Sequence, residues 1–169
     1  MNVQQAPATP GTRRAGAPHL PAQALKPALD GDIGSPPSDH DFIMMHAVYR
    51  ASGGIARADE LAGSLEEHAC GDFVGLARLI VSRQIFSFQW HDSFWVPMFQ
   101  FDRRSLHVKA GPRQVLHELT TVFDGWTLAT WFAQPNGWLK EHRPIDLLDS
   151  KLAAVVEAAR ADRFIAAGW

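Results

Sequence analysis

Hydrophobic side chains recur every three or four positions after residue 40, and this pattern predicts three helices in the first half of the chain. The first, over residues 41–51, is apolar nearly all round, so we expect it to be buried on several sides. The second covers residues 57–67 and ends before a short break. The third begins at Asp72, whose side chain can cap a helix that is apolar at positions 73, 76, 77 and 80.

The hydrophobic period changes to two after Arg83, which predicts a β-hairpin over residues 85–101. The run IFSFQW places its aromatic side chains on one face and its polar side chains on the other. A turn-like HDS separates it from a second extended run, FWVPMFQF. Because Pro97 cannot donate a ladder hydrogen bond, we predict that the second strand is an edge or bulged strand.

Helical periodicity returns in the last third of the chain. Pro112 is suited to the first position of a helix whose apolar stripe continues to residue 124. A shorter helix is predicted over residues 126–133 and stops before the next proline.

Two prolines then organise the segment before the last predicted helix. Pro135 and Pro144 each fix the backbone for the start of a short helical turn. Ser150 is the predicted cap of the last helix, and Gly168 stands where a glycine would end it.

These elements predict a mainly α fold with one β-hairpin. Residues 1–40 hold seven of the eleven prolines and no Phe, Trp or Tyr, so they cannot bury enough apolar surface to fold and are expected to be a disordered tail. Residues 41–104 follow the order helix, helix, helix, hairpin, which is typical of a winged-helix module. Residues 105–169 are predicted to form a small helical domain.

Composition narrows the classes of function. Residues 41–169 carry 13 Lys and Arg against 15 Asp and Glu, which weakens strong charge-driven nucleic-acid binding and leaves only a local basic patch open. A single cysteine provides neither a disulfide framework nor a cysteine metal site. No apolar run approaches the ~18 residues needed to cross a bilayer, so we expect a cytoplasmic protein without a membrane partner.

The sequence contains no pattern that we interpret as catalytic. Eight histidines occur without H-x-x-x-H or H-E-x-x-H spacing, and no glycine-rich loop has the spacing of a phosphate-binding motif. Cys70 has no evident base beside it. We therefore expect no enzyme, no metal and no cofactor.

The winged-helix order suggests a DNA-binding face on the third predicted helix, with the hairpin as a wing. Arginine suits contacts to phosphate and guanine. The candidate DNA contacts are Arg78, Ser82, Arg83, Arg103 and Arg104. Val74 and Val81 project near the same face, which favours a protein contact, and the helices and hairpin could also pack together only to close a core.

The stretch WFAQPNGWLKEHRPIDLL, followed by Ser150 and a helix ending in AAGW, resembles the toxin-binding domain of MbcA/ParS/Xre-type antitoxins. That family has a Trp-rich helix, a P-N-x-x-L turn, a P-x-D-L-L segment and a last helix that closes on glycine. The matching residues are Trp131, Pro135, Asn136, Leu139, Pro144, Asp146, Leu147, Leu148 and Gly168. The match covers residues 112–169, and VPMFQFD upstream is similar to a segment of some members. Members often have a glycine where this chain has Glu141-His142-Arg143.

The resemblance implies an antitoxin of a type II toxin–antitoxin pair whose partner is a RES-domain toxin that consumes NAD. It also implies that the last helix and the C-terminus plug the toxin's active site, and that the antitoxin forms a homodimer. Arg160 and Arg163 share a helix face, and guanidinium groups suit a site that binds pyrophosphate. The candidate toxin contacts are Arg160, Arg163, Phe164, Gly168 and Trp169.

Two alternatives belong to other classes. A DNA-binding transcriptional regulator would act through residues 41–104 and use the C-terminal domain only to dimerise. An orphan adaptor would have kept the domain without a toxin. The antitoxin and the regulator are compatible, because antitoxins of this kind often repress their own operon, which makes operator DNA a candidate partner.

Overall fold

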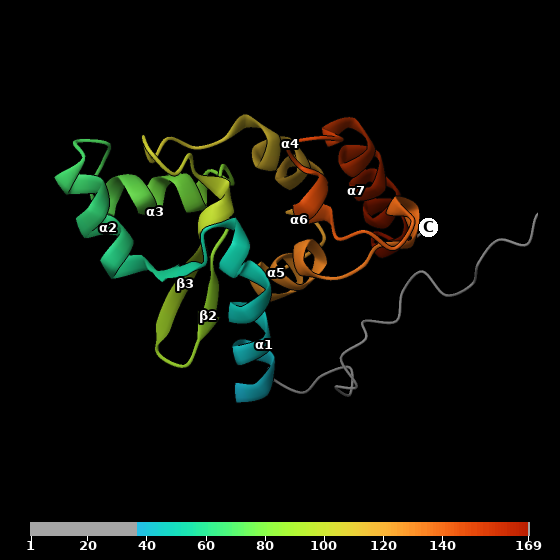
Figure 1. Cartoon of the computed structure of the whole chain (residues 1–169), viewed down its shortest axis with the longest axis horizontal. Coiled ribbons are helices and arrows are strands. Elements are labelled where there is room, and N and C mark those ends of the chain that lie inside the picture. The colour runs from blue at the N-terminus through green and yellow to red at the C-terminus, as the bar shows by residue number, and fades with distance from the viewer. Residues whose placement is uncertain (1–36, 169) are drawn as a thin grey trace, which may run out of the picture.

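The computed structural model describes residues 37–168 as a mainly helical fold with one small antiparallel sheet (Figure 1). The helices are α1 (Asp39–Tyr49), α2 (Ala58–Glu67), α3 (Phe73–Val81), α4 (Ala110–Leu119), α5 (Gly125–Ala133), α6 (Pro144–Leu147) and α7 (Leu152–Ala166). The strands are β1 (Ile55–Arg57), β2 (Phe88–Trp90) and β3 (Ser93–Pro97), and the short 3-10 helices are η1 (Arg50–Ser52), η2 (Met98–Gln100) and η3 (Gly137–Leu139). Residues 1–36, which make up most of the predicted tail, and Trp169 lie outside the described residues.

Helix α1 starts earlier and is more exposed than the sequence predicts. Ser38 caps it, and the Asp41 carboxylate in turn accepts from the Ser38 backbone N–H, so the helix begins at Asp39. Only Met45 and Tyr49 are buried, so the predicted burial on several sides is wrong. The helix packs by one face, and Ile43 remains exposed.

The predicted hairpin is confirmed, but its place in the sheet differs from the prediction. The strand order is β1-β3-β2, so β3 is the central strand and the predicted edge position is wrong. Pro97 is tolerated because it is the last residue of β3, opposite Ile55, and the next amide, of Met98, donates to the Gly54 carbonyl. Strand β1 was not predicted. It follows Gly53 and Gly54, whose φ angles of 114° and 82° turn the chain back from α1.

Two hydrophobic cores hold these elements together. The larger one joins α1 and the hairpin to α4, α5 and α7, and the Tyr49 hydroxyl donates to the Ala129 carbonyl at 2.7 Å inside it. This core crosses the boundary predicted between residues 104 and 105. The smaller core packs α2 and α3 on the sheet, around Leu61, Leu76 and Val96. Figure 1 shows α2 at one end of the molecule and α7 at the other, with α4 between them.

Two predicted helix boundaries in the last third are wrong. Helix α4 starts at Ala110, which makes Pro112 its third residue, and it ends at Leu119 rather than at residue 124. Ser150 does not cap α7, because Lys151 occupies the cap position and no side chain bonds to the first turn. Asp124 caps α5 by accepting from the Thr127 amide. These corrections leave the predicted order of the helices unchanged.

Candidate functional site

Three side chains of the stretch from Trp131 to Trp138 converge on one buried carboxylate in α7. Asp162 is 5% exposed and accepts three side-chain hydrogen bonds. Trp131 Nε1 and Asn136 Nδ2 donate to Oδ2 at 2.7 and 2.8 Å, and Trp138 Nε1 donates to Oδ1 at 2.9 Å. A buried carboxylate is costly unless such donors satisfy it, so these three bonds tie α5 and the proline-bounded turn to the last helix. We call this arrangement the Asp162 clamp.

Asp162 was not predicted from the sequence, because a single aspartate in an alanine-rich helix is typical of a solvent-exposed position. A signal was nevertheless present. The motif supplies two indole N–H groups and one amide within eight residues, and partly buried donors of this kind require an acceptor. Only the folded chain shows that this acceptor is 24 to 31 residues further on.

The turn between the two motif prolines is closed by Asn136. Its side-chain oxygen accepts from the Trp138 amide at 2.9 Å, and its backbone N–H donates to the His142 carbonyl at 3.1 Å. Lys140 and Glu141 therefore adopt left-handed φ angles of 55° and 62°. Glycine is favoured at such angles, so Lys140 and Glu141 hold a backbone conformation that would cost glycine less.

The second half of the motif anchors α6. Pro144 starts this helix as predicted and is itself buried. Arg143 makes a bidentate ion pair with Asp146, with Nε–Oδ2 and Nη2–Oδ1 distances of 2.7 and 3.1 Å. Of the motif leucines, Leu139 and Leu148 are buried in the larger core, and Leu147 packs against that core. The first motif proline, Pro135, is exposed. The motif is therefore mostly structural in its contacts.

A second buried carboxylate, Glu118 of α4, holds the two predicted toxin-binding arginines. Arg160 Nε lies 3.0 Å from Oε1, and Arg163 Nη1 lies 2.5 Å from Oε2. Arg160 Nη1 also donates to Glu157 at 2.7 Å. The hydrogen bond from Arg160, together with the charges of both arginines, lowers the pKa of Glu118 despite its burial. Arg160 and Arg163 therefore lie on the same face of α7, as predicted, and that face is turned toward α4.

The end of α7 presents apolar side chains. Phe164 is 63% exposed and Ile165 is 42% exposed. Gly168 follows the helix with a φ of 64°, as expected for a glycine just past a helix end. Trp169, the last predicted toxin contact, lies outside the described residues.

A groove between the end of α3 and helices α4 and α7 brings together residues from both predicted sites. It has a volume of about 670 Å³. The lining side chains include Ser82, Arg83, Arg113, His117, Glu118, Arg160 and Arg163. Two predicted DNA contacts and two predicted toxin contacts therefore line one surface, which we call the basic groove.

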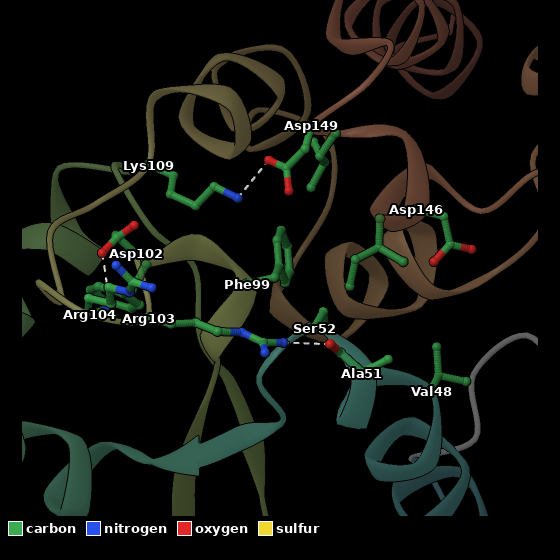
Figure 2. Close-up of a pocket in the computed structure, with 13 residues that line it drawn as sticks. Val48, Ala51, Ser52, Phe99, Asp102, Arg103, Arg104, Lys109, Asp146 and Asp149 are labelled. Atoms are coloured by element: carbon green, nitrogen blue, oxygen red, sulfur yellow. Dashed lines mark hydrogen bonds and ion pairs between the residues drawn. The ribbon is translucent and has the colours of Figure 1, made fainter.

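The other predicted DNA contacts lie elsewhere. Arg103 and Arg104 follow η2 and line a different pocket, of 460 Å³ (Figure 2). The turn between β2 and β3 holds His91 and Asp92 instead, so the predicted wing does not carry these arginines. The Arg103 guanidinium donates to the Ala51 carbonyl, and this hydrogen bond joins the loop that follows η2 to η1.

The outward side of α3 is apolar. Phe73, Val74 and Val81 are 60%, 53% and 83% exposed, so Phe73 does not join the core as the predicted stripe implies. Only Leu76 of this helix is buried. Arg78 lies on this side, beside a hollow lined by Val74 and Val81. Exposed apolar groups of this size favour a protein contact over a DNA contact.

Within residues 37–168, no group of three or more His, Cys, Asp or Glu side chains could hold a metal ion. No helix in the same range is long and apolar enough to cross a membrane.

Comparison of the chain with models of protein families, with curated proteins and with solved structures found no match.

Proposed function

We propose that this chain is an antitoxin that neutralises a RES-domain, NAD-consuming toxin in the cytoplasm by presenting the end of α7 to it. The observation that carries the proposal is the Asp162 clamp. The residues on which the family resemblance depends, Trp131 and Asn136, bond to the last helix. A motif whose side chains fix α7 is what an antitoxin that uses this helix as its binding element would need.

The proposed binding element is pre-organised. Binding is weakened by the entropy of ordering flexible groups, so a helix that is already held in place gives tighter binding than a free one. Asp162 fixes α7 two residues before Phe164, and Glu118 fixes it through Arg163. Exposed Phe164 and Ile165 are the kind of apolar anchor that carries affinity at protein interfaces.

The test is co-expression with the product of the neighbouring gene, followed by co-purification and a growth assay. We expect a stable complex and rescue of growth. The double variant Phe164→Ser/Ile165→Ser should weaken binding at least about tenfold and abolish rescue. Phe94→Ser is the matched control, because Phe94 is similarly exposed, at 56%, but lies on β3, outside both α7 and the apolar side of α3. Full rescue by the double variant would contradict the proposed role of α7.

A homodimer is part of the proposal, and the apolar side of α3 is the surface that supports it. Val74 and Val81 lie seven residues, or about two helical turns, apart on one side of α3, and both line a hollow that a second copy could fill. The mass in solution, measured by light scattering, should be that of two chains. Val74→Lys/Val81→Lys should give the mass of one chain, whereas an unchanged mass would place the dimer contact elsewhere.

A DNA-binding regulator is the second candidate, supported by exposed Arg78 and Arg83 at the end of α3. In that case Arg78→Ala/Arg83→Ala should weaken binding to operator DNA and leave toxin neutralisation unchanged. Titration at two salt concentrations separates this candidate from the orphan adaptor, because phosphate contacts make binding strongly salt-dependent.

A further inference from the structure

The basic groove combines four arginines with one carboxylate. Arg83 comes from the end of α3, Arg113 from α4, and Arg160 and Arg163 from α7, while Glu118 is the only acidic side chain among the lining residues. The surrounding region as a whole is mildly acidic, with 13 Lys and Arg against 15 Asp and Glu over residues 41–169. This local excess of positive charge therefore contrasts with the rest of the fold, and it suits an anion.

Glu118 positions two of the four guanidinium groups, those of Arg160 and Arg163. Each of its two oxygens accepts from a different guanidinium, Oε1 from Arg160 and Oε2 from Arg163. A guanidinium has five N–H donors, and these bonds use only some of them, so donors remain for a ligand. Because both side chains are already ordered, a ligand would lose less binding free energy to ordering them.

The other half of the charge is uncompensated. In the part of the chain that the structure describes, residues 37–168, the guanidinium groups of Arg83 and Arg113 make no hydrogen bond and no ion pair. Arg83 has a φ of 58° because it follows the end of α3, where the Gln84 amide donates to the Leu79 carbonyl at 3.0 Å.

The pocket of Figure 2 provides a contrast within the same molecule. It too is lined by three cationic side chains, but three aspartates accompany them. Lys109 pairs with Asp149 at 2.7 Å, and Arg103 donates to a backbone carbonyl. Three aspartates thus accompany three cationic side chains there, whereas a single carboxylate accompanies four arginines among the lining residues of the basic groove.

We propose that the basic groove binds a phosphate or pyrophosphate group. Guanidinium groups match the geometry of phosphate oxygens, and the groove volume of 670 Å³ is typical of a small-ligand site. No Phe, Tyr or Trp is among its lining residues and His117 is the one aromatic ring there, so the four guanidinium groups make phosphate the group that the groove is best suited to recognise. The phosphate belongs either to a free polyphosphate or to the backbone of a nucleic acid.

Calorimetric titration of the full chain with inorganic pyrophosphate, and separately with a short DNA duplex of arbitrary sequence, tests the proposal. Wild type should bind at least one of the two probes saturably. Arg83→Ala/Arg113→Ala should weaken that binding at least about tenfold, because two unpaired guanidinium groups are lost. Arg113→Glu alone changes the charge of the groove by the same two units and should weaken binding to a similar extent. Arg50→Ala is the matched control, because Arg50 is exposed and lies on η1, outside the basic groove, and it should leave affinity within about twofold of wild type.

The outcomes separate the two sources of phosphate. Arginine-dependent binding of pyrophosphate identifies a free polyphosphate site, and arginine-dependent binding of the duplex alone identifies the nucleic-acid backbone. The proposal is overturned if neither probe binds, or if binding is the same in the double variant and in Arg50→Ala. It goes beyond the antitoxin proposal and does not depend on it. The tested arginines are not proposed toxin contacts, so the growth assay and the titration can fail independently.

Discussion

At the scale of single residues, two buried carboxylates, Asp162 and Glu118, fix the position of the last helix. Both lie where a carboxylate is unfavourable without partners, at 5% and 7% exposure. Asp162 is satisfied by neutral N–H donors from the motif, and Glu118 by two guanidinium groups. The two sites differ in what their loss would leave behind: unpaired indole and amide groups at one, and unpaired positive charges at the other.

Replacing Asp162 with alanine should be strongly destabilising. The change leaves the side-chain donors of Trp131, Asn136 and Trp138 without their acceptor, and a cost of about 2–4 kcal/mol is expected. Urea denaturation followed by circular dichroism measures it. Asp149→Ala is the control, because its side chain is 81% exposed and pairs with Lys109, so the change should cost no more than about 1 kcal/mol. Equal stabilities of the two variants would show that the clamp contributes little.

Glu118 should make stability depend on pH in a defined direction. Its folded pKa is lower than the usual 4.5, so its stabilising contribution is complete above that value and is lost as the pH falls through the folded pKa. The difference in free energy of unfolding between wild type and Glu118→Gln should therefore shrink between neutral pH and about pH 3.5. Glu157→Gln removes an exposed partner of Arg160 and should show a much smaller change with pH. A difference that stays constant with pH would refute this assignment.

At the scale of elements, the sequence predicts what is local and fails where position depends on distant partners. The hairpin and the order of the helices follow from hydrophobic period, proline and capping residues, so they were predictable. Strand β1 was missed because it has three residues, too few to display an alternating pattern. Its pairing with β3 over Ile55–Arg57 also explains why the predicted edge position of the second hairpin strand was wrong, since nothing near Pro97 specifies a partner 42 residues earlier.

The left-handed turn after η3 gives a prediction for an element that carries the motif. Lys140→Gly should raise the free energy of unfolding by up to about 1 kcal/mol, because glycine adopts the φ of 55° without steric cost. Lys151→Gly is the control, because Lys151 is also an exposed lysine but has a φ of −141°, which any residue can adopt. It should instead destabilise by about 0.5–1 kcal/mol. Thermal unfolding of both variants measures the contrast, and a gain for both would point to a cause other than φ.

At the scale of the whole molecule, the larger core links the first helix to the last third of the chain. Tyr49 of α1 is completely buried and bonds to Ala129 of α5. Phe99 of η2 packs against Phe132 of α5 with ring centroids 4.8 Å apart. The sequence could identify the elements on both sides of residue 104, but these contacts between them depend on the fold.

A fragment of residues 105–169 should therefore not fold as the independent domain that the sequence predicts. Its α5 would expose the face that Tyr49 and Phe99 cover in the full chain, and apolar surface of that size favours a loosely packed state. We expect poor dispersion in its amide NMR spectrum and no cooperative thermal transition. A chain of residues 37–169 is the control and should give both a dispersed spectrum and a cooperative transition. Matching behaviour of the two chains would support the predicted boundary.

The Asp162 clamp also provides an intrinsic fluorescence signal, from Trp138. Trp138 is the one exposed tryptophan in residues 37–168, at 51%, and its indole is fixed to α7 through Asp162. Its emission should lie at longer wavelength than that of the half-buried tryptophans, because water surrounds much of its ring. A partner that covers this side of α7 would remove that water, and the emission would shift to shorter wavelength without any attached dye. The encounter could then be followed in real time on the unmodified chain.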